Sequence, residues 1–327
     1  MGSPARVESG EPEPLKIAVR GFTEWDGAKE RRAATYRKFA GNVLILDTET
    51  RISAAQNLTF GSYRLLEAGQ CTEEGLFYGD DLTPKEMACL HEYVRSRDAD
   101  VAPGFSKKLL LYNQRDFLRL FYEAAFRSRF LVVAFNLPFD LSRLAFDVAS
   151  ARDEFAGGFS LMLWQRPGSE LENKYRPRFA VKHIDSKRAL KGFTKPVVLD
   201  YADRIPEGSK TGKPDKRYTF RGHFLDLRTL AFALTDRGHS LKTACEAFGV
   251  EHGKTEPDRH GIVTPEYIDY NRRDVLATTE LYFKLMEEYE RHPIPLQATR
   301  AFSPASIGKA YERAMSVVPP TGPAARL

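Results

Sequence analysis

Residues 43–50 read Val-Leu-Ile-Leu-Asp-Thr-Glu-Thr, an apolar run that stops abruptly at Asp47. A short continuous apolar run is typical of a strand that is buried on both faces in an α/β sheet. Residues 131–135, Leu-Val-Val-Ala-Phe, form a second run of this kind, which stops at Asn136. Each run therefore predicts a buried strand that ends in polar side chains.

Strand and helix signals alternate around these two runs. Further strands are predicted near residues 59–66, 75–78 and 223–227, and helices near 83–96, 113–126, 138–148, 264–290 and 304–315. Several helix starts follow from capping residues and from prolines in the first turn. Residues 151–221 differ, because they are rich in Gly, Pro and Lys and carry short strand-like pieces. The pattern indicates a mixed α/β domain, with one central sheet flanked by helices and an inserted β-rich subdomain.

Composition excludes several classes of protein. Hydrophobic residues make up 42% and charged residues 28% of the 327 residues, which is the balance of a globular domain and not of a disordered chain. The longest apolar stretches are far too short to span a bilayer. Three widely spaced cysteines, Cys71, Cys89 and Cys245, provide neither a disulfide framework nor a cysteine-pair zinc site. We therefore expect a cytoplasmic protein with no membrane partner.

Positive charge is concentrated in one region of the chain. The net charge is +5, from 49 Lys and Arg against 44 Asp and Glu. Residues 165–222 carry 15 Lys and Arg against 7 Asp and Glu, a net +8, which leaves −3 for the rest of the chain. Such a block is expected either on a surface that binds a polyanion or in a solvated, lysine-rich loop. Charge alone favours neither interpretation.

Two acids follow the first apolar run. Asp47 and Glu49 lie two residues apart, so their side chains leave a strand on the same side. Two carboxylates beside an apolar wall stay ionised cheaply only when a cation neutralises them. Hard divalent cations such as Mg²⁺ favour oxygen ligands of this kind. Taken alone, however, the pair is explained at least as well as the polar exit of a strand.

Two further acids lie in predicted helices. Asp140 falls in a first helical turn, where an acid complements the helix dipole, and Asn136 stands at the capping position. Asp274 lies one turn after Tyr270 on the long C-terminal helix, so the two share a face, and Arg272 points elsewhere. Each of these residues has an ordinary structural explanation when it is considered by itself.

In combination and in this order, the three motifs resemble those of the DEDD exonuclease superfamily, in its tyrosine subtype. The matching stretches are Leu46-Asp47-Thr48-Glu49-Thr50, Phe135-Asn136-Leu137-Pro138-Phe139-Asp140 and Tyr270-Asn271-Arg272-Arg273-Asp274. The histidine subtype would carry a histidine at position 269, where this chain has Asp269. The resemblance covers about residues 40–290 and implies a ribonuclease H-like fold.

Within that superfamily, the second motif is most similar to the proofreading domain of family B DNA polymerases, especially the protein-primed ones. Those domains share the Asn-x-x-Phe-Asp spacing and a β insertion ahead of the third motif. The polymerase motifs Asp-x-x-Ser-Leu-Tyr and Tyr-x-Asp-Thr-Asp do not occur in this sequence. The resemblance thus implies an exonuclease domain over residues 41–292 with an insertion at about 151–221. A lead-in over 1–40 precedes it, and a helical segment over 293–327 follows.

The resemblance implies a metal-dependent 3′→5′ exonuclease that hydrolyses phosphodiester bonds, with single-stranded DNA as the preferred substrate. Its cofactors would be two Mg²⁺ or Mn²⁺ ions, about 4 Å apart. The metal ligands would be Asp47, Glu49, Asp140 and Asp274, with Asp47 bridging the two ions. Zinc is a poor fit to ligands that are all oxygens. Tyr270 would orient the attacking water, because a phenol with an ordinary pKa of about 10 is better suited to hydrogen bonding than to proton abstraction.

Substrate contacts are expected from several side chains near these motifs. Asn136 and Phe139 are candidates for holding the terminal nucleotide, although Phe139 suits the protein core equally well. Lys242 stands where related exonucleases often carry a lysine that contacts a phosphate. The remaining candidates are Thr48 in the first motif and, in the basic insertion, Lys187, Arg188 and Lys191.

Two alternatives remain open at this stage. The tyrosine subtype also degrades RNA, and recognition of a 2′-hydroxyl depends on pocket shape and not on a sequence motif. A 3′→5′ exoribonuclease is therefore the first alternative. A non-catalytic nucleic-acid-binding module on the same fold is the second, and the intact set of four acids argues against it.

Overall fold

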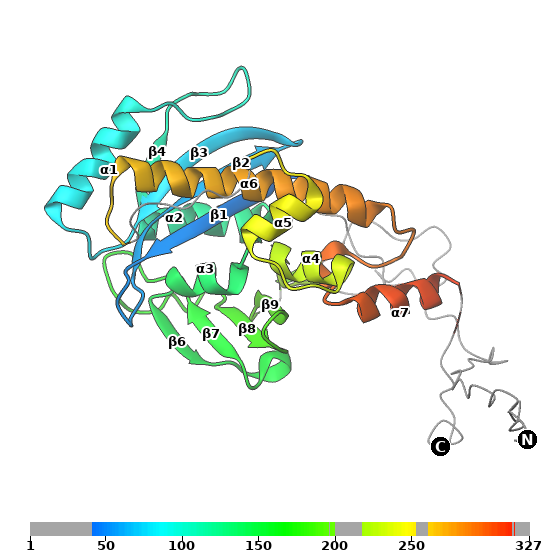
Figure 1. Cartoon of the computed structure of the whole chain (residues 1–327). Coiled ribbons are helices and arrows are strands. Elements are labelled where there is room, and N and C mark those ends of the chain that lie inside the picture. The colour runs from blue at the N-terminus through cyan, green and yellow to red at the C-terminus, as the bar shows by residue number, and fades with distance from the viewer. Residues whose placement is uncertain (1–40, 196, 200–217, 253–260, 316, 318–327) are drawn as a thin grey trace, which may run out of the picture.

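A computed structural model describes residues 41–195, 197–199, 218–252, 261–315 and 317. Within them a mixed, six-stranded sheet forms the centre (Figure 1). Its strands are β1 (Val43–Thr50), β2 (Leu58–Glu67), β3 (Gln70–Tyr78), β4 (Leu110–Asn113), β5 (Leu131–Ala134) and β12 (His223–Asp226). The order across the sheet is β12-β5-β1-β2-β3-β4. Strand β1 pairs antiparallel with β2 and parallel with β5, and β5 is in turn parallel to β12.

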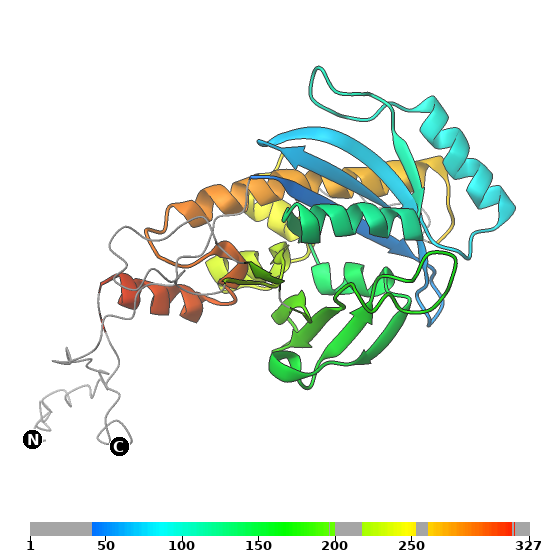
Figure 2. The same ribbon diagram turned by 180° about the vertical axis from the view of Figure 1, so that it is seen from behind.

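Helices cover both faces of the sheet. They are α1 (Pro84–Ser96), α2 (Gln114–Tyr122), α3 (Leu137–Arg143), α4 (Leu227–Thr235), α5 (Leu241–Phe248), α6 (Pro265–Glu290) and α7 (Pro304–Ala314). The long helix α6 crosses one face, with α4 and α5 on the same side (Figure 1). Helix α2 lies on the opposite face, as the reverse view shows (Figure 2). None of the helices within the described ranges is long and apolar enough to cross a membrane.

Strand β1 is buried on both faces, as its apolar run predicts. Val43 and Ile45 pack with α4, α5 and α6, whereas Leu44 and Leu46 pack with α2 and the helix α3. Side chains of a strand alternate between its faces, so both sets need an apolar layer opposite them. The same alternation continues past the apolar run, and it directs the acids at positions 47 and 49 toward α6.

Two helix starts agree with their sequence signals. Thr83 caps α1 in a capping box with Glu86, and Pro84 occupies the first helical position. Thr264 caps α6 by accepting from the backbone N–H of Tyr267, again with a proline next in the chain. These caps fix the residue at which each helix begins.

The predicted β-rich insertion contains a small antiparallel sheet of four strands and a separate pair, counting described residues alone. The strands are β6 (Asp147–Ser150), β7 (Phe159–Met162), β8 (Phe179–His183), β9 (Ala189–Phe193), β10 (Val197–Leu199) and β11 (Tyr218–Phe220). The small sheet lies beyond α3, away from α6 (Figure 1). The polar loop predicted over residues 209–214 and the tail over 1–40 lie outside the described residues.

The structure corrects the sequence interpretation in two details and refines it in a third. The helix predicted over 138–148 ends at Arg143, and Val148 lies in β6, where it pairs with Leu161 and is 52% exposed. Backbone pairing with β7 therefore outweighs the helical spacing of the apolar residues. The helix predicted from Asn113 through residue 126 is confirmed in its extent, but it is α-helical only to Tyr122 and π-helical over Glu123–Arg127. Strands β4 and β9 were not predicted, because they are short and β9 contains Lys and Gly, which have low strand propensity.

A buried ion pair ties α6 to the sheet. Arg272 donates through Nε and Nη2 to both oxygens of Glu74 on β3, at 2.8 and 2.9 Å, and Glu74 is 3% exposed. Arg272 also donates to the hydroxyl of Tyr93 on α1, at 3.1 Å. This confirms that Arg272 points away from the edge shared by Tyr270 and Asp274. The pair fixes the rotation of α6 about its axis, and with it the side of the helix that faces β1.

We expect Arg272→Ala to lower the free energy of unfolding by about 3–5 kcal/mol, because the buried carboxylate of Glu74 loses its bidentate charged partner and keeps only the backbone N–H of Asp100 as a hydrogen-bond donor among the described residues. The measurement is urea denaturation followed by circular dichroism. Arg273→Ala is the matched control, since Arg273 is exposed on the same helix, and it should change the free energy by less than about 0.5 kcal/mol. Equal losses in the two variants would show that the ion pair does not secure α6.

Candidate active site

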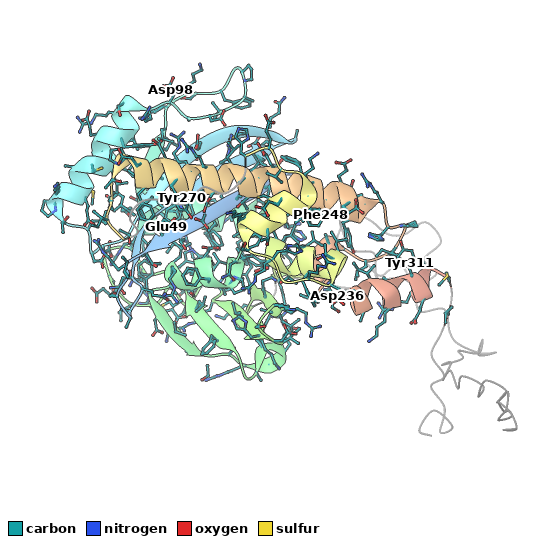
Figure 3. The ribbon with its side chains drawn as sticks, viewed as in Figure 1. Glu49, Asp98, Asp236, Phe248, Tyr270 and Tyr311 are labelled. Carbon is teal, nitrogen blue, oxygen red and sulfur yellow. The ribbon has the colours of Figure 1, made fainter. Side chains whose placement is uncertain are left out.

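A pocket of about 260 Å³ lies between the end of β1, the start of α3 and the middle of α6. It is lined by Asp47, Thr48, Glu49, Phe135, Asn136, Phe139, Asp140, Leu241, Tyr270 and Asp274. The four predicted acids and the tyrosine, which come from three distant parts of the sequence, therefore meet in one place. Figure 3 shows two of them, Glu49 and Tyr270, next to each other between β1 and α6.

The acids of β1 are held by donors on α6. Asn271 Nδ2 donates to Asp47 Oδ2 at 2.7 Å and approaches Glu49 Oε1 at 3.4 Å. The hydroxyl of Tyr267 donates a short hydrogen bond to Glu49 Oε2. Neither donor carries a charge, so these bonds orient the carboxylates without neutralising them.

Asp140 approaches from the other side of the pocket, in the first turn of α3. Thr48, whose side chain leaves β1 on the face opposite to Asp47, donates from Oγ1 to Asp140 Oδ1 at 2.8 Å. Asp140 Oδ2 is buried and has no hydrogen-bond partner among the described residues. Burial raises the pKa of Asp140 to about 7 against the effect of the Thr48 hydrogen bonds, and the nearby charges of Asp226 and Glu49 raise it further.

Asn136 stands at the capping position of α3, but its side chain makes no capping hydrogen bond. Asp226, the last residue of β12, accepts from the backbone N–H of Leu137 at 3.1 Å and from that of Thr229 at 2.7 Å. One carboxylate thus serves the starts of both α3 and α4. The capping explanation for the Asn136 side chain is therefore wrong, and that side chain lines the pocket instead.

Tyr270 is buried and its ring stacks on that of Tyr267, with 5.9 Å between the ring centroids. Burial raises the pKa of Tyr270 above its ordinary value, and the charge of Asp274 and a hydrogen bond to it act in the same direction. The phenol therefore keeps its proton at neutral pH. This agrees with a role as a hydrogen-bond donor and argues against a role as a general base.

Phe139 is half-buried at the pocket, and its ring contacts Arg143, a residue outside the three motifs. The guanidinium of Arg143 lies 4.8 Å from the Phe139 ring centroid. Arg143 Nη1 also donates to the carbonyls of Ala55 and Gln56, at 3.4 and 3.1 Å. It therefore links α3 to the loop that follows β1. The sequence offers no signal for this contact, since Arg143 also suits the last turn of a helix.

The basic side chains predicted to bind substrate are not among the described residues that line the pocket. Lys242 comes nearest, because it is exposed on α5 directly after the pocket residue Leu241. Arg188 forms an ion pair with Asp185 at 2.5 Å, and Lys187 Nζ lies over the ring of Phe232, 4.6 Å from its centroid. Lys191 lines a separate, larger pocket of about 360 Å³. A groove for a single strand along these residues stays a prediction.

The acidic side chains that line this pocket offer oxygen atoms, which are the ligands that hard divalent cations prefer. One of these oxygens, Asp140 Oδ2, is buried and has no hydrogen-bond partner among the described residues. No group of three or more His, Cys, Asp or Glu side chains in the described ranges is arranged to hold a metal ion as it stands.

No protein-family model and no curated protein sequence matches this chain. Function is therefore inferred from the pocket and its chemistry.

The raised pKa of Asp140 gives a prediction for the metal-free protein. The folded state binds this proton more tightly than the unfolded chain does, whose aspartate pKa is about 3.9. The stabilisation is therefore complete below that value and is lost as the pH rises through the folded pKa. We expect the free energy of unfolding in EDTA to fall between about pH 4 and pH 7, and Asp140→Asn to flatten that fall.

The measurement is urea denaturation at several pH values in EDTA. Glu246→Gln, at an exposed acid on α5, serves as the control and should keep the pH dependence of the parent protein. An Asp140→Asn variant with the parental slope would place the pH dependence elsewhere in the pocket.

Proposed function

We propose that this protein is a metal-dependent 3′→5′ exonuclease that removes nucleotides from the 3′ ends of single-stranded DNA. The observation that carries the proposal is the convergence of Asp47, Glu49, Asp140 and Asp274 with Tyr270 in one pocket. Such a set of oxygen ligands beside a hydrogen-bonding phenol has the chemistry that phosphodiester hydrolysis needs. The central sheet, mixed and flanked by helices, is compatible with the ribonuclease H-like fold that the motifs imply.

In this proposal the four acids would hold Mg²⁺ or Mn²⁺, which would activate a water molecule and stabilise the leaving 3′-oxygen. The chain's own residues would do the positioning. Thr48, Asn271 and Tyr267 hold the acids in place through uncharged donors. Tyr270, kept protonated by its surroundings, would donate to or orient the attacking water.

Substrate would enter beside α3. Phe139 is the aromatic surface at the pocket, and stacking of a base on such a ring is worth about 1–3 kcal/mol. Arg143 lies over the Phe139 ring, and the ring lines the pocket, where it could receive the terminal base. Asn136, whose side chain is not used as a helix cap, would add a hydrogen bond.

The choice of DNA over RNA rests on the resemblance to proofreading domains and not on a contact in the pocket. RNA therefore belongs in the same experiment. The test is a digestion ladder on 5′-labelled single-stranded DNA and on RNA of the same sequence, with Mg²⁺, with Mn²⁺ and with EDTA. Stepwise shortening of DNA with either metal and none with EDTA is expected. Shortening of RNA alone would make the protein an exoribonuclease. A protein that binds both strands and cuts neither would be a binding module.

We expect Asp47→Ala to abolish this digestion and to leave the fold intact. Removing one acid relieves like-charge repulsion, and Asn271 keeps Glu49 as an acceptor, so metal-free stability should stay level or rise. The rise in melting temperature on adding Mn²⁺ should shrink, because stabilisation by a ligand follows its affinity. Glu92→Ala, at an exposed acid on α1, is the control and should behave like the parent. Parental digestion by Asp47→Ala would refute the metal-site assignment.

Tyr270→Phe tests the role of the hydroxyl, since the ring and its stacking are kept. If the hydroxyl orients the attacking water, kcat should fall by about a hundred- to a thousandfold, the usual effect of one hydrogen bond made in the transition state. Mn²⁺ affinity and melting temperature should stay near the parental values. Tyr282→Phe, at a buried tyrosine on the same helix outside the pocket, should keep full activity. A parental kcat in Tyr270→Phe would remove the tyrosine from the mechanism.

A further inference from the structure

Asn271 lies between Tyr270 and Asp274 of the third motif, and it contacts both acids of the first. Its side chain is fully buried, and its single amide nitrogen reaches Asp47 Oδ2 at 2.7 Å and Glu49 Oε1 at 3.4 Å. One uncharged group on α6 thus bridges two carboxylates on β1.

The orientation of this amide is fixed by Ser62. Ser62 lies on β2 directly opposite Asp47, is 1% exposed, and donates from Oγ to Asn271 Oδ1 at 2.6 Å. The oxygen and nitrogen of an amide have nearly the same shape, so their partners decide which way the group points. The reverse orientation would place Oδ1 against two carboxylates and would leave the Ser62 hydroxyl facing an amide donor.

The same face of α6 supplies a second donor. Tyr267 lies one helical turn before Asn271, and its hydroxyl donates to Glu49 Oε2. Each oxygen of Glu49 therefore accepts a hydrogen bond from α6. Each carboxylate oxygen has more than one acceptor site. A hydrogen bond from one of these donors therefore does not by itself prevent the same oxygen from binding a cation.

We propose that Asn271, fixed in orientation by Ser62, is the positioning residue for Asp47 and Glu49, holding both carboxylates ready for a divalent cation. This inference rests on the proposed function. An apolar side chain at position 271 would leave the two acids to repel each other, whereas a lysine or arginine would neutralise them and compete with the cation. A neutral donor avoids both effects. Groups that orient metal ligands typically change metal affinity by about 10–100-fold.

The first test uses Mn²⁺ alone as the probe, with unbound Mn²⁺ measured by electron paramagnetic resonance. Asn271→Leu should weaken the Mn²⁺ affinity by about 10–100-fold, and Ser62→Ala should weaken it by a smaller factor. Thr279→Val is the control, because Thr279 is buried on the same helix and donates to the carbonyl of Val275. Its affinity should equal that of the parent. Parental affinity in Asn271→Leu would overturn the inference, and if that variant does not fold, parental affinity in Ser62→Ala would do so.

The second test needs no metal. In EDTA, Ser62→Ala leaves Asn271 Oδ1 without its donor, and Asn271→Leu leaves the Ser62 hydroxyl without its acceptor. The double variant should therefore be no less stable to urea than Asn271→Leu alone. Additive losses would refute the link between Ser62 and Asn271. If the parent protein bound no Mn²⁺, both the proposed function and the proposal that Asp47 and Glu49 are positioned for a cation would be refuted. The stability of the double variant in EDTA would still decide whether Ser62 fixes the orientation of Asn271.

Discussion

Carboxylates that lie close together in a partly buried pocket repel one another, and each of them loses contact with water. The structure meets this constraint with uncharged donors: Thr48 for Asp140, Asn271 for Asp47 and Tyr267 for Glu49. Such donors orient the acids and add no charge of their own. The pocket therefore keeps negative charge that would attract a cation. The packing of β1 against α6 and α3 holds those donors within hydrogen-bond distance of the acids.

The alternation of side chains along β1 is what makes this arrangement possible. Odd-numbered positions first supply apolar contacts to α6 and then the two acids, while Thr48 points the other way and reaches α3. Antiparallel pairing with β2 brings Ser62 opposite Asp47, and the ion pair of Arg272 with Glu74 sets the rotation of α6. The alternation of side chains along β1, the pairing of β1 with β2 and the rotation of α6 thus together determine the geometry of the site.

Much of this could be predicted from the sequence. Continuous apolar runs predicted β1 and β5, caps and prolines predicted α1 and α6, and the resemblance of three ordered motifs to a known family predicted the pocket residues. The contacts of Ser62, Asn271 and Asp226 could not be predicted, because each depends on which strand or helix lies beside it. The basic block shows the same limit, since a charge count does not say where side chains point, and Arg188 is paired with Asp185.

The hydrogen bond between Asn271 and Asp47 joins residues that are 224 positions apart in the chain. Contacts between such distant residues form slowly, because the long loop between them must close before the contact can contribute any stabilising free energy. During synthesis, the strand that carries the first acids leaves the ribosome long before α6 exists. A chain that is cut short ahead of residue 274 holds an incomplete acid set. Synthesis through α6 is therefore a precondition for a complete pocket.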